Sequence, residues 1–260
     1  MSHGRPRSCA GKLPTAHPNL GTPFRFSPSE DDLKKVTKRV SDYVWHEMPD
    51  DGGWDYGTNL TYLKDLCDYW VREFNWWDHQ AKLDEFNHFQ TCVNGIDTHY
   101  LFEKGSGPNP TPLLISHGWP GSICEFLKIV EPLAHPERFG GSVEQAFDVI
   151  APSLPGFGFS ARPARPMGPR AMAGHLNTLM TEHLGYATYM AQGGDWGGAI
   201  CSWLGFDHAQ YCKALHINVL TMRHALGPQT LDEQRWAEKF DHDQQVEDGY
   251  RTVQATRPQT

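Results

Sequence analysis

The sequence lacks the features that would assign it to several functional classes at once. Its six cysteines include no C-x-x-C pair, which predicts reduced, mostly buried thiols and indicates neither a metal site nor a cofactor. It has no run of Lys and Arg, and its net charge of −8 argues against a nucleic-acid partner. No stretch is apolar for long enough to cross a bilayer, and the N-terminus has no apolar signal core. We therefore expect a globular, cytoplasmic protein without a membrane anchor.

What the chain does contain is an alternation of strand and helix patterns. Residues 1–23 are rich in Pro and Gly and are predicted to be a disordered tail. Apolar residues recur at helical spacing in two segments before residue 88, and Asn94-Gly95 then indicates a hairpin. After the hairpin, strands and helices alternate, which predicts a three-layer α/β fold with a mostly parallel sheet. The expected strands are 112–116, 146–151, 188–192 and 214–220, and the expected helices are 33–44, 60–74, 123–133, 172–184, 199–206 and 231–240.

The most informative motif is G-G-D-W-G-G at residues 193–198, between a predicted strand and a predicted helix. Small residues on both sides of one reactive side chain are typical of a nucleophile elbow, where the chain turns sharply and passes close to itself. The reactive position holds Asp195 rather than the usual serine. The alternative is a glycine-rich turn in which Asp195 only caps the next helix.

Two further motifs follow predicted strands, where ligand sites of open α/β sheets lie. In H-G-W-P-G-S, residues 117–122, the Trp119 amide could form an oxyanion hole with the Trp196 amide. The alternative is a turn whose Trp119 packs into the core. In S-L-P-G-F-G-F-S, residues 153–160, Phe157 and Phe159 could wall an apolar pocket, or could simply pack within a loop.

The three motifs in this order, behind W-D-Y-G-T-N-L-T-Y-L-K-D-L-C-D-Y-W-V-R-E-F-N-W-W at 54–77, resemble the microsomal-type epoxide hydrolases of the α/β-hydrolase superfamily. The resemblance implies an N-terminal lobe at 24–87 that wraps the core, an α/β-hydrolase core at 88–220 and the start of a lid at 221–260. It implies that Asp195 attacks a small apolar epoxide, that Tyr250 in the lid donates a proton, and that water then releases the product. His117, Pro120, Phe157 and Phe159 are expected at the substrate pocket, with His117 in a structural hydrogen bond rather than acting as a base.

The family pattern also implies parts that have no matching position in this sequence. No strand pattern follows residue 221, so the last two core strands, a second lid tyrosine, the acid and the hydrolytic His are unmatched. We expect a fragment of a longer protein; completion by a second polypeptide, or a degenerate remnant, are the alternatives. The strand at 214–220 would then be an exposed sheet edge, through which homo-oligomers could form. Two other functions stay open, namely a haloalkane dehalogenase-like hydrolase, which also uses an elbow Asp, and a non-catalytic binding remnant.

Overall fold

The computed structural model describes residues 20–47, 53–219 and 226–256. The chain divides into two compact units, one ending at Val219 and one containing the last two helices. Residues 1–19, the greater part of the predicted tail, lie outside the described residues. Thr22 and Pro23, at its end, form the short strand β1.

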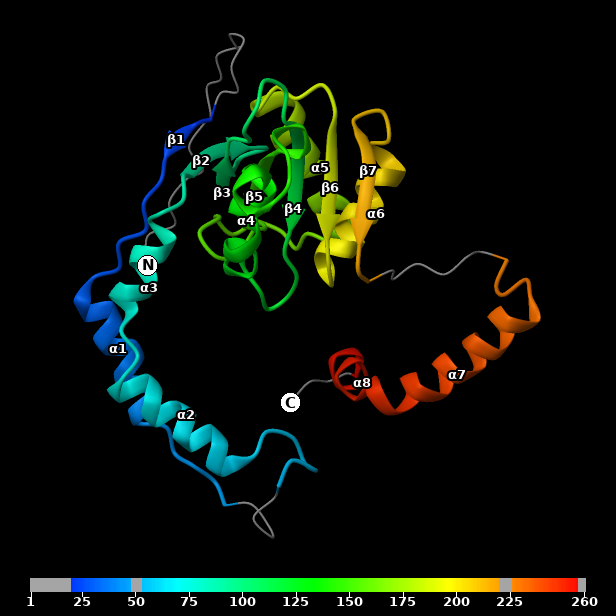
Figure 1. Cartoon of the computed structure of the whole chain (residues 1–260). Helices are drawn as coiled ribbons and strands as arrows, with labels where there is room; N and C mark the ends of the chain where they lie inside the picture. Colours follow the sequence, from blue (N-terminus) through cyan, green and yellow to red (C-terminus); the bar gives the residue numbers. More distant parts are fainter. Residues whose placement is uncertain (1–19, 48–52, 220–225, 257–260) are drawn as a thin grey trace. The chain divides into compact units, whose positions relative to one another are not determined.

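The first unit is built on one seven-stranded sheet with the order β1-β2-β3-β5-β4-β6-β7. The first three strands are joined in antiparallel pairs, and β3 is also antiparallel to β5. The pairs β4–β5, β4–β6 and β6–β7 are parallel. Figure 1 shows β7 at one edge of this sheet. The strands are β1 (Thr22–Pro23), β2 (His88–Val93), β3 (Ile96–Glu103), β4 (Thr111–Ser116), β5 (Phe147–Pro152), β6 (Tyr189–Gly193) and β7 (Cys212–Ile217).

The predicted hairpin is confirmed, because β2 and β3 pair in full register around Asn94 and Gly95. Both turn residues have a positive φ, 47° and 81° respectively. Asparagine and glycine are the residues that adopt this conformation with least strain, which is why the dipeptide predicts the turn.

Helices cover the sheet on both faces and give the expected three layers. Each of the six predicted helices is present, and the structure divides two of them, at 123–133 and 172–184, into shorter segments. The α-helices are α1 (Glu30–Ser41), α2 (Leu60–Arg72), α3 (Trp76–Leu83), α4 (Leu127–Ala134), α5 (Pro169–Thr178), α6 (Trp196–Asp207), α7 (Leu231–Glu247) and α8 (Gly249–Ala255). The 3-10 helices are η2 (Ile123–Phe126), η3 (Pro136–Phe139) and η4 (Val143–Gln145), and η5 (Leu179–His183) is a π-helix.

Alternate residues of the central strands pack into two separate hydrophobic cores. Leu114 and Ile150 point to the face covered by α5 and α6, whereas Leu113 and Val149 point to the face covered by α4. Successive side chains of a strand point to opposite faces of the sheet. Strands that are apolar on both faces therefore need helices packed against each face. The structure therefore has the α/β-hydrolase fold with a mixed, mostly parallel sheet.

The helices before the sheet are less buried. α1 and α2 pack against each other, and neither has a buried residue. α1 begins at a Ser29 cap, whose hydroxyl accepts a hydrogen bond from the Asp32 amide at 3.1 Å. α3 is tied to the chain before α1 because Gln80 donates to the Phe26 carbonyl at 2.6 Å.

The second unit consists of helices α7 and α8 in its described part. α7 starts with a capping box, in which Thr230 and Glu233 each bond to the other's backbone amide. The sequence predicts the first half of α7 only, and it does not separate α8 from it.

The prediction that the cysteines are reduced is wrong for one of them. Cys67, Cys124, Cys201 and Cys212 are free, but Cys92 is disulfide-bonded. Spacing along the chain did not indicate this, since a disulfide depends on which cysteines meet in space. Among the described residues, no helix is long and apolar enough to span a membrane.

Candidate active site

The G-G-D-W-G-G motif forms a sharp turn between β6 and α6. Asp195, at the turn, has φ 50° and ψ −125°, outside the regions that non-glycine residues normally occupy. The neighbouring glycines are required by close packing. A Cβ on Gly193 would lie 2.3 Å from the Gly197 carbonyl oxygen, and one on Gly197 would lie 2.0 Å from the Ser116 oxygen. The elbow is thus wedged against the end of β4.

The Asp195 side chain accepts a hydrogen bond from the Trp119 amide, with a nitrogen–Oδ1 distance of 2.8 Å. It makes no capping bond to α6, although Asp195 occupies the N-cap position. The capping alternative is therefore wrong. The carboxylate is held instead by the loop that follows β4, 76 residues earlier in the chain.

The loop after β4 fits closely against Asp195. A Cβ on Gly118 would lie 2.5 Å from Asp195 Oδ1, so only glycine lets the backbone approach this near. The Trp119 side chain is 56% exposed, which excludes the alternative in which it packs into the core. The peptide bond between Trp119 and Pro120 is cis. Trp196 is the first residue of α6, so its amide lies at the positive end of that helix, directly after Asp195.

His117 is fully buried, and both of its ring nitrogens contact backbone groups. Nε2 lies 3.1 Å from the Leu154 amide, and Nδ1 lies 2.9 Å from the Gly118 carbonyl oxygen. Burial lowers its pKa, because desolvation disfavours the charged ring. These contacts are the structural hydrogen bonds that the sequence favoured over a role as base.

The two phenylalanines of the third motif take different directions. Phe157 packs edge-on against His117, with ring centroids 5.5 Å apart. Phe159 packs against Phe26 at 4.7 Å and against His99 at 5.0 Å, under the N-terminal segment. Phe157 therefore contacts His117, which belongs to the loop that binds Asp195. Phe159 instead packs against the N-terminal segment.

Asp195 opens onto a hollow of about 580 Å³ at the carboxyl ends of the parallel strands. Pro120 lines it, whereas His117, Phe157 and Phe159 do not. Glu125, Asn218 and Val219 also line the hollow and were not predicted as site residues from the sequence. Glu125, in η2, completes an S-x-x-E pattern that begins at Ser122, the last residue of H-G-W-P-G-S. Asn218 and Val219 follow β7, the neighbour of β6. The lining is Gly118, Trp119, Pro120, Gly121, Glu125, Gly194, Asp195, Asn218 and Val219.

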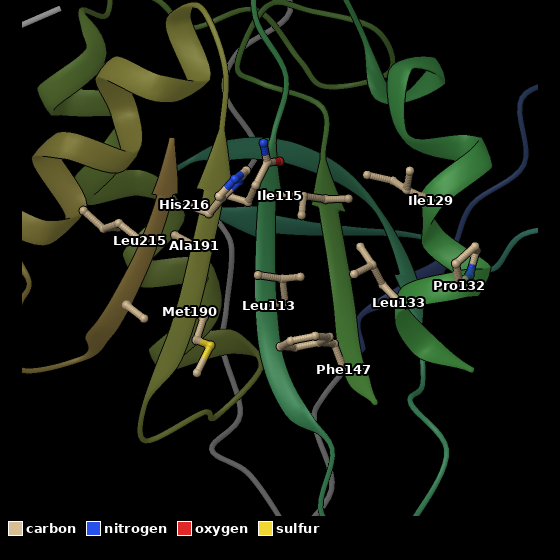
Figure 2. Close-up of a pocket in the computed structure, with 12 residues that line it drawn as sticks. Leu113, Ile115, Ile129, Pro132, Leu133, Phe147, Met190, Ala191, Leu215 and His216 are labelled. Carbon is tan, nitrogen blue, oxygen red and sulfur yellow. The ribbon is translucent and has the colours of Figure 1, made fainter. Parts of the chain in front are cut away.

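A second, more apolar hollow of about 530 Å³ lies on the face of the sheet (Figure 2). Leu113 of β4, Met190 of β6 and His216 of β7 line it, together with Leu133 of α4. It lies along the strands rather than at their carboxyl ends and does not include Asp195. Its shape and apolarity alone do not make it a catalytic site, since it offers no comparable set of reactive groups.

The proposed lid residue lies in the second unit. The backbone of Tyr250 is in α8, and its side chain lies outside the described part of the structure. In the described ranges, no cluster of His, Cys, Asp or Glu could hold a metal ion.

Two family models match the chain. The model described as "Epoxide hydrolase N terminus" matches residues 21–126. The model described as "alpha/beta hydrolase fold" matches residues 111–259, which is more than half of the chain.

Curated relatives and solved structures agree with these models. A putative epoxide hydrolase of Stigmatella aurantiaca is 34% identical over 92% of this chain and 55% of its own length. Epoxide hydrolase 1 of Oryctolagus cuniculus is 31% identical over 92% and 57%. The epoxide hydrolase structure from Aspergillus niger has a TM-score of 0.80 at 26% identity, covering 95% of this chain and 66% of that one. The juvenile hormone epoxide hydrolase structure from Bombyx mori has a TM-score of 0.77 at 27% identity, covering 91% and 60%.

The chain spans about half the length of the curated relatives it matches. Within that span, the family models, the curated relatives and the solved structures agree on one family of hydrolases. The chain belongs to the epoxide hydrolase family of the α/β-hydrolase superfamily.

Proposed function

We propose that this protein opens an epoxide to a vicinal diol and that Asp195 is its nucleophile. The observation that carries the proposal is a carboxylate at a strained elbow, with Oδ1 held by the Trp119 amide at 2.8 Å. An acid suits attack at a saturated carbon, because the ester that forms can be cleaved by water. A serine in this position would form an ether, which water does not release.

In the first step, Asp195 Oδ2 forms a bond to an epoxide carbon. The ring C–O bond breaks, and its electron pair goes to the epoxide oxygen. Oδ2 is the attacking atom because Oδ1 is engaged by Trp119. Tyr250 of α8 is proposed to give its phenolic proton to the departing oxygen, since an unprotonated alkoxide is a poor leaving group.

In the second step, water adds to the carbonyl carbon of the Asp195 ester. Negative charge then develops on Oδ1, the atom that the Trp119 N–H already contacts. The Trp196 N–H, at the start of α6, is proposed as the second donor. Collapse of this intermediate releases the diol and restores the carboxylate, and the proton that the hydrolysis sets free returns to the Tyr250 phenolate.

The second step also requires a base to activate the water. No histidine is found among the described residues that line the Asp195 hollow, and both ring nitrogens of His117 are engaged. We therefore propose that the hydrolytic His and its partner acid belong to a longer protein, and that this chain alone is alkylated and then stalls.

Intact-protein mass spectrometry after incubation with styrene oxide tests the proposal. We expect one adduct of the mass of the epoxide, mapped to Asp195 by peptide sequencing and absent in Asp195→Asn. Glu125→Gln is the matched control, because it removes the other carboxylate of the same hollow and should leave the adduct in place.

Four outcomes would contradict parts of this proposal. An adduct that persists in Asp195→Asn would overturn the role of that residue. Steady production of diol by this chain alone would overturn the predicted stall. Chloride release from a chloroalkane, without an epoxide adduct, would favour the dehalogenase alternative, and a rise in melting temperature with apolar ligands but no adduct would favour a binding remnant.

A further inference from the structure

The peptide unit between Gly118 and Trp119 is engaged at both ends. Its N–H, on Trp119, donates to Asp195 Oδ1 at 2.8 Å. Its carbonyl oxygen, on Gly118, lies 2.9 Å from His117 Nδ1. We propose that His117 is a positioning residue, which holds this peptide with its N–H toward Asp195 by donating a hydrogen bond to its carbonyl. This inference rests on the proposed function of Asp195.

The protonation state of His117 is set by its surroundings. The Leu154 N–H can only donate, so Nε2, 3.1 Å away, must be the acceptor. The ring is buried and its pKa is lowered, so it stays neutral and carries its one proton on Nδ1. Nδ1 is therefore a donor, as the contact with the Gly118 carbonyl requires.

The position of the Leu154 amide is fixed by its neighbour Ser153, whose amide, hydroxyl and carbonyl groups all make hydrogen bonds. The Ser153 amide donates to the His99 carbonyl at 2.9 Å, and its hydroxyl lies 2.9 Å from His99 Nδ1. Ser160 donates to the Ser153 carbonyl at 2.7 Å. Hydrogen bonds from strand β3 thus reach His117 through the loop after β5.

The hydrogen bond from His117 is needed because residue 118 is a glycine. Glycine is required there by the close approach of Asp195, but it leaves the following peptide freer to rotate than any other residue would. A rotated peptide would turn its carbonyl oxygen toward the carboxylate. The bond from His117 opposes this rotation, and by polarising the carbonyl it also strengthens the N–H as a donor.

Two substitutions separate the two contacts of His117. In His117→Asn the side-chain amide can still donate from the δ position to Gly118, but it has no atom at the ε position for Leu154. In His117→Gln an oxygen at the ε position can still accept from Leu154, but the δ donor is lost. His175→Gln is the matched control, since His175 is also buried and bonds only through Nε2 to Thr98 at 2.8 Å.

The readout is the cleavage of the Asp195 ester by hydroxide, which needs no catalytic base. The styrene oxide adduct of each variant is isolated, and its loss at mildly alkaline pH is followed by mass spectrometry in native buffer and in concentrated guanidinium chloride. The native rate divided by the denatured rate measures how much the folded oxyanion hole accelerates cleavage of the ester. We expect this ratio to fall about tenfold in His117→Gln, the effect of losing one well-aligned hydrogen bond, and to be kept in His117→Asn and His175→Gln.

A ratio kept in His117→Gln would overturn the inference and leave the proposed function intact. A ratio lost in His117→Asn alone would show that His117 acts through Leu154 instead. If the wild-type protein forms no adduct, the proposed function fails, and the inference is still decided by ¹⁵N NMR of the wild-type ring. That spectrum should show neutral His117 protonated at Nδ1; a ring protonated at Nε2, or at both nitrogens, would overturn the inference even if every variant failed to fold.

Discussion

Replacing Gly197 by alanine should destabilise the protein and damage the site together. The added Cβ would lie 2.0 Å from the Ser116 carbonyl oxygen and 3.0 Å from the His117 oxygen. Neither is the end of a flexible side chain, because both belong to the backbone where β4 ends. An ordinary contact begins at 3.4 Å, so the start of α6 must move by roughly 1.4 Å, and overpacking of this kind costs about 1–3 kcal/mol. We expect the upper end of that range.

Gly174→Ala is the matched control. It makes the same chemical change within α5, where the nearest atom to the new Cβ is His208 Nε2 at 3.9 Å. No clash arises there, and alanine is the better helix former by about 1 kcal/mol. The two variants should therefore differ in their free energy of unfolding by about 3–4 kcal/mol, with opposite signs relative to wild type.

Urea unfolding followed by circular dichroism measures this difference. The same shift of α6 would lengthen the 2.8 Å contact between the Trp119 amide and Asp195, so Gly197→Ala should also lose the native acceleration of ester cleavage. A Gly197→Ala protein as stable as Gly174→Ala would refute the reasoning, since it would mean that the elbow is not wedged against β4.

Two further predictions concern buried polar groups. Burial lowers the pKa of His99 to about 3 and of His175 to about 4, below the value of about 6.5 in the unfolded chain. Their contribution to stability is therefore complete above about pH 6.5 and is lost as the pH falls through the folded values. Thermal melts between about pH 7 and pH 4 should fall less steeply in a His99→Gln, His175→Gln double variant, and an unchanged slope would contradict this. Asp148→Ala should lower the free energy of unfolding by about 3 kcal/mol, because the buried carboxylate accepts from the Tyr186 hydroxyl and the Gly105 amide, each at 2.9 Å. A loss below about 1 kcal/mol in urea would contradict that expectation.

Local chemistry explains which parts of the fold were predictable. Asn94 and Gly95 predict the hairpin because few other residues accept a positive φ. The central strands are recognisable because both of their faces are buried, which makes them apolar throughout. The π-helix η5 was not predicted as such, since its residues have the same apolar spacing as an α-helix.

The pocket lining was harder to predict than the fold. Phe157 and Phe159 are two residues apart in one loop, yet one packs on His117 and the other on Phe26. Glu125 and Asn218 come from separate segments and meet Asp195 only because η2 and the end of β7 lie beside the elbow. Proximity of this kind depends on the order of strands in the sheet, which a single sequence does not state.

The sequence by itself determined the kind of elbow and the chemistry that its carboxylate favours, because glycine spacing and residue type are local properties. Only the tertiary structure decided what holds that carboxylate. Asp195 is bound by an amide 76 residues away, and the peptide that carries this amide is held by His117, which is held in turn by Leu154. Hydrogen bonds between distant segments require the sheet to align the ends of β4, β5 and β6 at one edge, and that alignment is a property of the folded chain.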